Sequence, residues 1–131
     1  MIQVGTLLKV SDKTGVNLVR CVKVLGSSKK RIAYLGDVIL VSIKQVNPKR
    51  IRLLKTHKRR RFLKGKLHRA LVIRTKVFHR RSPNVFMKFN ENSVVLVNRR
   101  VVPISNRVYG PVFRELCRKY PSLGCMTQKM I

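Results

Sequence analysis

The residues of this chain that could do chemistry are mostly cations, and the densest group lies between Lys49 and Arg69. That segment holds eleven lysines and arginines and no acidic residue. In an extended chain these charges would recur every ~6–7 Å, from a rise of ~3.3 Å per residue. This spacing is shorter than the ~8–10 Å screening length at ordinary salt, so the charges repel one another unless a partner neutralises them. A nucleic-acid backbone has the matching chemistry.

The whole chain has the same imbalance of charge. Its 131 residues include 31 Lys and Arg against four acids, which gives a formal net charge of +27. This excess predicts a polyanionic partner, because a merely solvated surface usually mixes both signs. Apolar residues make up 44%, enough for one domain, residues 1–131, with a core of its own. Membrane binding is not predicted, since no window approaches ~18 uninterrupted apolar residues.

Catalysis is not predicted either. Metal-assisted phosphoryl transfer needs clustered carboxylates, and the only acids are Asp12, Asp37, Glu91 and Glu115, dispersed over turns, a loop and a helix start. The sequence has no phosphate-binding glycine loop and no nucleophile elbow. Its three histidines lack neighbouring cysteines that would complete a zinc set, and its three cysteines are typical of free thiols. We therefore expect no catalytic residue, no metal and no cofactor.

Short strands are the elements that would position the cations. The predicted strands span 6–10, 18–25, 32–35, 38–43, 67–75, 85–89 and 93–97. Arg20 and Lys23 have opposite parity, so their strand has either two partly covered faces or a bulge. The last two strands are expected to form a hairpin around Asn90-Glu91-Asn92. This pattern favours a mainly β fold, a small closed barrel without exposed edges.

Only the C-terminal segment, about 111–131, is predicted to be helical. Pro111 would occupy the first turn of a helix, where its missing N–H costs nothing. Glu115 would follow early and Arg118-Lys119 late, as the helix dipole favours. A second short turn is expected over 126–131.

Three basic groups would flank the strands. They are the tip Lys29-Lys30-Arg31, the segment 49–69, and Arg80-Arg81 with Arg74. Because these groups lie near neighbouring strands with little compensating acid, we expect one contiguous footprint.

The aromatic residues suggest a smaller contribution from base stacking. Phe62 and Phe78 are embedded among cations and are the candidates for contacting bases. Phe86 and Phe89 have opposite parity, so at most one is expected to face outward. Without a regular aromatic platform, recognition is expected to rest on phosphates and RNA shape.

Five motifs occur in the order found in one known family. They are 22–26 (Val-Lys-Val-Leu-Gly), 36–39 (Gly-Asp-Val-Ile), Lys64-Gly65 followed by 70–76, 89–96, and 107–112 (Arg-Val-Tyr-Gly-Pro-Val) with Arg114-Glu115-Leu116. Together they resemble the large-subunit ribosomal protein numbered fourteen in the universal set, from Met1 to about Leu116. The chain departs from that pattern at the 11–16 turn, at Ser27, at Asn106, and in an apparent insertion at 52–61.

The resemblance implies a five-stranded closed β-barrel with a projecting β-ribbon and a short helical C-terminal segment. It implies binding to large-subunit rRNA, with the large-subunit proteins numbered three and nineteen as neighbours. One face would look toward the small subunit and join intersubunit bridges through small-subunit rRNA. A ribosome-silencing factor would use the same surface.

The residues expected at these sites form two sets. Positions carried over from the family give an RNA-facing set of Lys23, Lys29, Lys30, Arg31, Arg74, Arg80 and Arg81. Charge alone adds Lys49, Arg50, Arg52, Lys55, Lys58, Arg59, Arg60, Arg61, Lys64 and Lys66. The intersubunit or factor surface would contain Asn106, Arg107 and Tyr109, together with Arg114 and Arg118 on a helix beginning at Pro111.

The insertion at 52–61 is expected to follow an RNA groove or a neighbouring molecule and to be disordered off the ribosome. Extreme basicity and the start at the family's own first residue favour a mitochondrial ribosome and synthesis within the mitochondrial matrix, with a bacterial cytoplasm as the alternative. The alternative function is a free nucleic-acid-binding barrel, similar to nucleoid proteins or translation factors.

Overall fold

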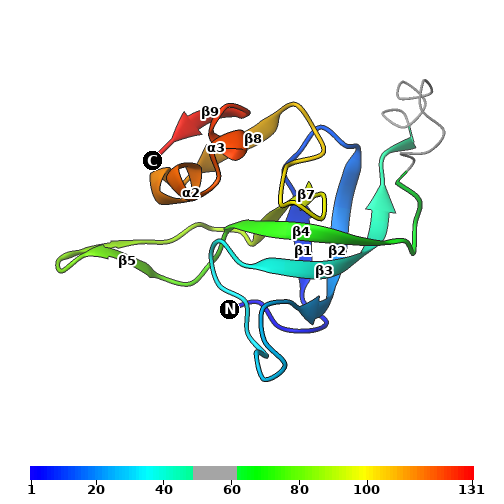
Figure 1. Ribbon diagram of the computed structural model, residues 1–131, viewed down its shortest axis with the longest axis horizontal. Coiled ribbons are helices and arrows are strands. Elements are labelled where there is room, and N and C mark those ends of the chain that lie inside the picture. The colour runs from blue at the N-terminus through cyan, green and yellow to red at the C-terminus, as the bar shows by residue number, and fades with distance from the viewer. Residues whose placement is uncertain (49–61) are drawn as a thin grey trace.

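The computed structural model describes residues 1–48 and 62–131 of the chain (Figure 1). Five strands close into a barrel in the order β1-β2-β3-β4-β7, which confirms the predicted architecture. The barrel strands are β1 (Leu7–Val10), β2 (Val16–Val24), β3 (Val38–Val46), β4 (Leu67–Arg74) and β7 (Ser93–Val97). Neighbours pair antiparallel except β1 and β7, which close the barrel in parallel. Closure leaves the barrel without an open sheet edge.

Two further units attach to the barrel. A ribbon of β5 (His79–Ser82) and β6 (Val85–Met87) projects from one end of it (Figure 1). The C-terminal unit contains β8 (Val108–Val112), α2 (Arg114–Lys119), α3 (Pro121–Gly124) and β9 (Thr127–Met130), and β8 pairs with β9 in parallel. Within the described part of the chain, no helix is long and apolar enough to cross a membrane.

The core consists of two apolar layers that share β4 and β7. Alternate residues such as Val72 and Leu96 point into the barrel, whereas Leu71 and Val95 point outward. The outward set is covered by the C-terminal unit, where Phe113 is 1% exposed. Both faces of these strands are therefore buried, which explains their nearly continuous apolar sequence.

The register of β2 confirms one sequence prediction and the structure corrects another. The pairing of β2 with β3 shifts between Cys21 and Lys23, which is the bulge that the opposite parity of Arg20 and Lys23 allowed. The predicted strand at 32–35 is wrong: the segment forms only an isolated bridge between Ala33 and Ile2.

The predicted hairpin of residues 85–97 is also wrong. β6 turns back at Ser82-Pro83-Asn84 to pair with β5, and β7 pairs with β1 and β4. The loop at 90–92 is not a hairpin turn, because its bonds run to β1 and to the loop that follows β4. Lys76 N donates to Asn92 Oδ1 at 2.9 Å, and Lys9 N donates to Asn92 O at 3.1 Å.

The C-terminal segment is less helical than predicted. Pro111 lies in β8 and the helix begins at Arg114, because β8 pairs with β9 and Ile131 N donates to Val112 O. Thr127–Met130 forms strand β9 and not the predicted second helical turn. The charge order within α2 is as predicted, with Glu115 in the first turn and Arg118 in the last.

Candidate nucleic-acid interface

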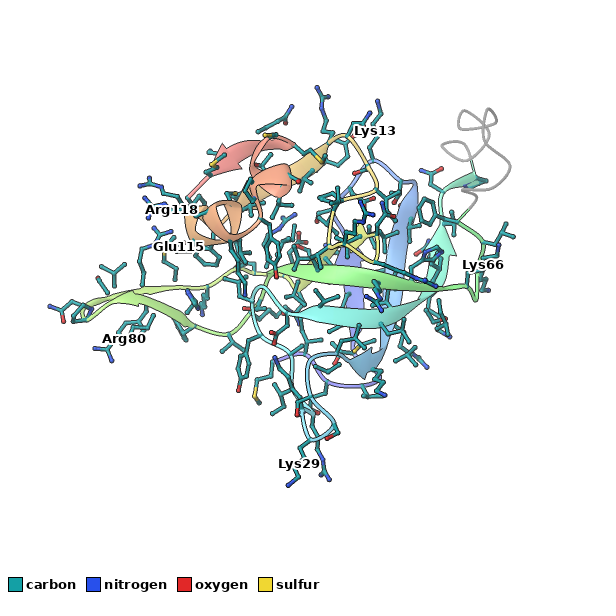
Figure 2. The ribbon with its side chains drawn as sticks, viewed as in Figure 1. Lys13, Lys29, Lys66, Arg80, Glu115 and Arg118 are labelled. Atoms are coloured by element: carbon teal, nitrogen blue, oxygen red, sulfur yellow. The ribbon has the colours of Figure 1, made fainter. Side chains whose placement is uncertain are left out.

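The predicted basic groups lie on separate projections of the molecule. Figure 2 shows Lys29 at the tip of the 26–37 loop, Arg80 on the ribbon and Lys66 at the opposite end of the barrel. All three side chains are exposed. The described cations therefore do not form the single contiguous footprint expected from the sequence, and a polyanion would contact the protein from several sides.

The base of the 26–37 loop is held by bonds to Asp37, and the loop carries exposed cations at its tip. Lys30 Nζ lies 2.8 Å from Asp37 Oδ1, and Tyr34 N donates to Asp37 Oδ2 at 2.8 Å. The loop is also bonded to the C-terminal unit, since Tyr120 Oη donates to Gly36 O at 3.3 Å. Lys29 and Arg31 stay exposed at the tip, and Lys23 is exposed near the end of β2.

The opposite end of the barrel carries Lys64 and Lys66, both exposed. Their turn is bonded to β3, because Gly65 N donates to Ile43 O at 2.8 Å and Ile43 N donates to Lys66 O at 3.1 Å. The charge-derived residues that precede this turn lie outside the described residues, together with the predicted insertion; they are Lys49, Arg50, Arg52, Lys55, Lys58, Arg59, Arg60 and Arg61.

Phe62 does not face a nucleic acid. It is 7% exposed, belongs to the core of the barrel and packs against His68 with ring centroids 5.0 Å apart. Burial, and secondly the charge of Lys66, lower the pKa of His68 and so favour its neutral form. The prediction that Phe62 contacts bases is wrong, because its ring is buried in the core, whereas Lys64 and Lys66 are exposed.

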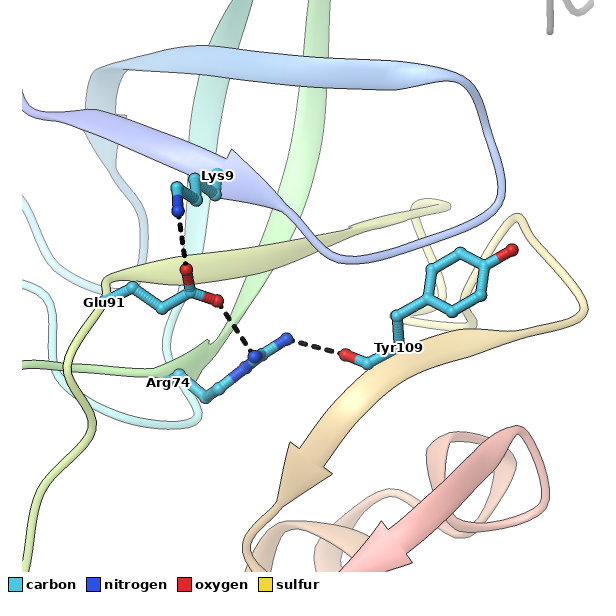
Figure 3. Close-up of polar contacts among 4 residues, drawn as sticks. All are labelled: Lys9, Arg74, Glu91 and Tyr109. Atoms are coloured by element: carbon cyan, nitrogen blue, oxygen red, sulfur yellow. Dashed lines mark hydrogen bonds and ion pairs between the residues drawn. The ribbon is translucent and has the colours of Figure 1, made fainter.

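Arg74 is likewise an internal residue. Figure 3 shows its guanidinium between the barrel and β8: Nη1 donates to Glu91 Oε1 at 2.9 Å and Nη2 donates to Tyr109 O at 2.7 Å. Glu91 also binds Lys9, with Nζ 2.9 Å from Oε2. Arg74 is 7% exposed, and burial lowers its pKa while Glu91 raises it. Arg74 therefore leaves the RNA-facing set and is a residue that positions Tyr109.

Arg81 joins the ribbon to the C-terminal unit. Its Nε and Nη2 donate to the two carboxylate oxygens of Glu115 at 2.8 and 3.1 Å, and Nη2 also donates to Ile131 O. The guanidinium lies over the Phe113 ring, 5.7 Å from its centroid. The hydrogen bond from Arg81 is the main cause that lowers the pKa of Glu115. Arg80, the next residue, is exposed.

Each of the four carboxylates is thus engaged within the fold. The fourth, Asp12, is buried and accepts hydrogen bonds from Thr14 N at 2.9 Å, from Thr14 Oγ1 and from Leu96 N at 3.0 Å. Burial raises its pKa, and the hydrogen bonds from Thr14 and Leu96 lower it by less. In residues 1–48 and 62–131, no three His, Cys, Asp or Glu side chains are placed to hold a metal ion.

The predicted intersubunit or factor residues lie in the C-terminal unit and the segment leading to it. Asn106, Arg107, Arg114 and Arg118 are exposed, and Tyr109 is half-buried. The segment is fixed to the barrel, since Lys13 N donates to Arg107 O and Tyr109 N donates to Ser11 O. Within α2, the four-residue spacing places Arg114 and Arg118 on one side, while Leu116 and Cys117 are buried.

The structure decides which of the two aromatic residues Phe86 and Phe89 faces outward. Phe86 is 57% exposed, whereas Phe89 packs in the outer core layer, as their opposite parity allowed. Lys88 adds a cation beside Phe78, with Nζ 4.7 Å from the ring centroid. Alternation within each strand of the ribbon could have revealed this face, had the pairing of Arg80 with Phe86 been known.

One protein family has a model that matches this chain. The family is described as ribosomal protein L14p/L23e, and the match covers residues 1–131. It therefore extends through residues 52–61 and through the tail beyond Leu116, two regions that the sequence motifs did not cover.

Proposed function

We propose, from the premise that this chain belongs to the ribosomal protein L14p/L23e family, that it binds large-subunit rRNA through cations on several separate projections. Membership in the family makes the chain a structural constituent of the large ribosomal subunit. Its role is architectural and not enzymatic. The proposed RNA-facing residues that the structure describes are Lys23, Lys29, Lys30, Arg31, Lys64, Lys66 and Arg80.

The observation that carries this proposal is that every acidic side chain already has a partner within the protein. All four are engaged inside the fold, by cations or by backbone N–H groups, while 31 Lys and Arg leave a net charge of +27. Most of the cations in residues 1–48 and 62–131 therefore have no carboxylate of this chain to neutralise them. A polymer of phosphates that surrounds the protein supplies the missing negative charge.

The C-terminal unit is the proposed contact with the small subunit. Arg114 and Arg118 of α2, with Tyr109 of β8 and the exposed Asn106 and Arg107 of the segment leading to it, are held on a platform bonded to the barrel, as an intersubunit bridge through small-subunit rRNA requires. The same surface is proposed to receive a ribosome-silencing factor. The large-subunit proteins numbered three and nineteen are the proposed protein neighbours.

We propose the mitochondrial ribosome as the location, on the extreme basicity of the chain, with the bacterial ribosome as the alternative. Fractionation of the source cells tests this: recovery with mitochondrial large subunits is expected, and recovery only with cytoplasmic ribosomes contradicts it. Sedimentation tests the function itself. The chain should remain with the large subunit through a high-salt wash, whereas a stable soluble pool would favour a free nucleic-acid-binding protein.

Salt titration of RNA binding tests how many phosphate contacts the protein makes. For large-subunit rRNA fragments, six to ten phosphate contacts give a log–log slope of roughly −4 to −9. Substitution of Lys29→Gln with Arg31→Gln should reduce the magnitude of that slope by about two, since each lost phosphate contact removes about one. The charge-matched control is Lys44→Gln with Lys129→Gln, two exposed cations outside the proposed set. Equal slopes for the two double variants would contradict the assignment of the 26–37 tip.

A further inference from the structure

The two faces of the β5–β6 ribbon differ in chemistry. One face packs against the C-terminal unit: the His79 ring lies 5.4 Å from the Phe113 ring, and Arg81 lies over Phe113 and pairs with Glu115. Met87 and Phe89 also pack into the outer core layer. Side chains alternate along a strand. Phe78 and Arg80, which flank His79, and Phe86 and Lys88, which flank Met87, therefore point the other way.

The intervening residues are two aromatics and two cations. Arg80 and Phe86 are paired across the strands, which places their side chains on the same face. Lys88 Nζ lies 4.7 Å from the centroid of Phe78, which joins the other two residues at the base of the ribbon. Phe78 is 63% exposed and Phe86 57% exposed. An aromatic and a cation therefore alternate both along and across this face.

We propose that this ribbon face, formed by Phe78, Arg80, Phe86 and Lys88, binds an unpaired stretch of RNA. The inference rests on the proposed function and makes it more specific, by adding base stacking to phosphate binding. Each ring offers a surface on which a base stacks, and each neighbouring cation is placed to meet a phosphate of the same strand. Sequence-tolerant single-strand binders combine the same two elements.

The composition of the face favours RNA over a protein partner. An apolar protein contact would be served by a continuous apolar surface, but here two of the four positions are cations. All four carboxylates of the chain are engaged elsewhere, so both cations are left to an external anion. A double-stranded RNA would use the cations alone, since its bases are already stacked within the helix.

The test compares a single-stranded oligoribonucleotide containing 2-aminopurine with its duplex, using the full chain. Phe78→Leu with Phe86→Leu keeps the apolar surface and the net charge but removes both rings. It should weaken single-strand binding about 5- to 100-fold for each base that stacks and abolish the quenching of 2-aminopurine. Duplex binding and the salt slope should stay as in the wild type. Leu67→Ala, at a residue 56% exposed on the barrel, is the control and should change neither.

Three outcomes would overturn the inference and are distinguishable from one another. Wild-type affinity and quenching in the double variant would show that the rings stack no base, while the salt-dependent binding of the proposed function would stand. If the wild type itself shows no salt-dependent RNA binding, the proposed function is overturned together with the inference. If the double variant binds RNA as the wild type does but is no longer incorporated into the large subunit, this face is a protein contact.

Discussion

Two arginines of one segment, Arg74 and Arg81, each pair with a glutamate, but they do so in opposite environments. The side chain of Arg74 is 9% exposed, and its guanidinium connects Glu91 to the Tyr109 carbonyl inside the molecule. The side chain of Arg81 is 29% exposed, and Glu115, its partner, is 46% exposed. The family resemblance predicts that both face RNA, whereas the structure gives both a partner within the protein.

The difference in burial shows how much each ion pair can contribute to the stability of the fold. A buried pair is costly to break, because the remaining charge has lost its solvent and its partner. An exposed pair contributes little to stability, because water and salt screen it. Arg74 therefore holds β8 on the barrel, whereas Arg81 orients the ribbon relative to α2. Neither guanidinium needs RNA to be neutralised, in contrast to Arg80.

The substitution Arg74→Ala should have the largest effect on stability. We expect the free energy of unfolding to fall by about 3 kcal/mol, at the low end for a broken buried pair, because Glu91 keeps Lys9 and some solvent. Arg81→Ala is the matched control and should cost about 1 kcal/mol or less. Urea denaturation of the free protein measures both. Equal losses would show that burial does not separate the two pairs.

Much of the barrel could be predicted from the sequence, because the signals for its strands are local. β-branched runs mark β2, β3 and β4, and the parity of Arg20 and Lys23 left a bulge as one of two alternatives. The position of Arg74 could not be predicted in the same way. Its partners lie 17 and 35 residues further along the chain, and no local pattern specifies contacts at that distance.

The predictions of the ribbon register and of an exposed Phe62 failed for related reasons. Two turn-like stretches, Ser82-Pro83-Asn84 and Asn90-Glu91-Asn92, are equally suited to a hairpin. The choice between them is made by bonds to Asn92 from Lys9 in β1 and from Lys76 in the loop after β4. Phe62 has charged neighbours in the sequence, but it packs in the barrel core beside β4.

Gly110 provides a sharper test of the Arg74 pair. Its φ is +81°, and a Cβ atom there would lie 2.7 Å from Arg74 Nη1. Gly110→Ala should therefore cost about 2 kcal/mol, from the left-handed backbone and from displacement of the guanidinium. Gly65→Ala is the control: its φ is +87° but nothing lies within 4 Å of its Cβ position, so it should cost only about 1 kcal/mol.

The double variant Arg74→Ala with Gly110→Ala isolates the contact. Once the guanidinium is gone, Gly110→Ala should cost no more than Gly65→Ala, so the two changes are not additive. Full additivity of the two losses in urea denaturation would show that the added methyl group does not act through Arg74.

The smallest effect is expected from the exposed pair, and it should depend on pH. Arg81 lowers the pKa of Glu115 below its ordinary value of 4.5. A lowered carboxyl pKa stabilises the fold above the ordinary value, and that contribution is lost as the pH falls through the folded-state pKa. The difference in urea midpoint between the wild type and Glu115→Gln should therefore be present at pH 6 and shrink below pH 4.5. Arg81→Gln should lose most of this acid-sensitive part, because Glu115 then lacks the hydrogen bond that is the main cause of its lowered pKa. A midpoint difference that stays constant from pH 6 to pH 3 would show that the pair contributes through packing on Phe113 and not through charge.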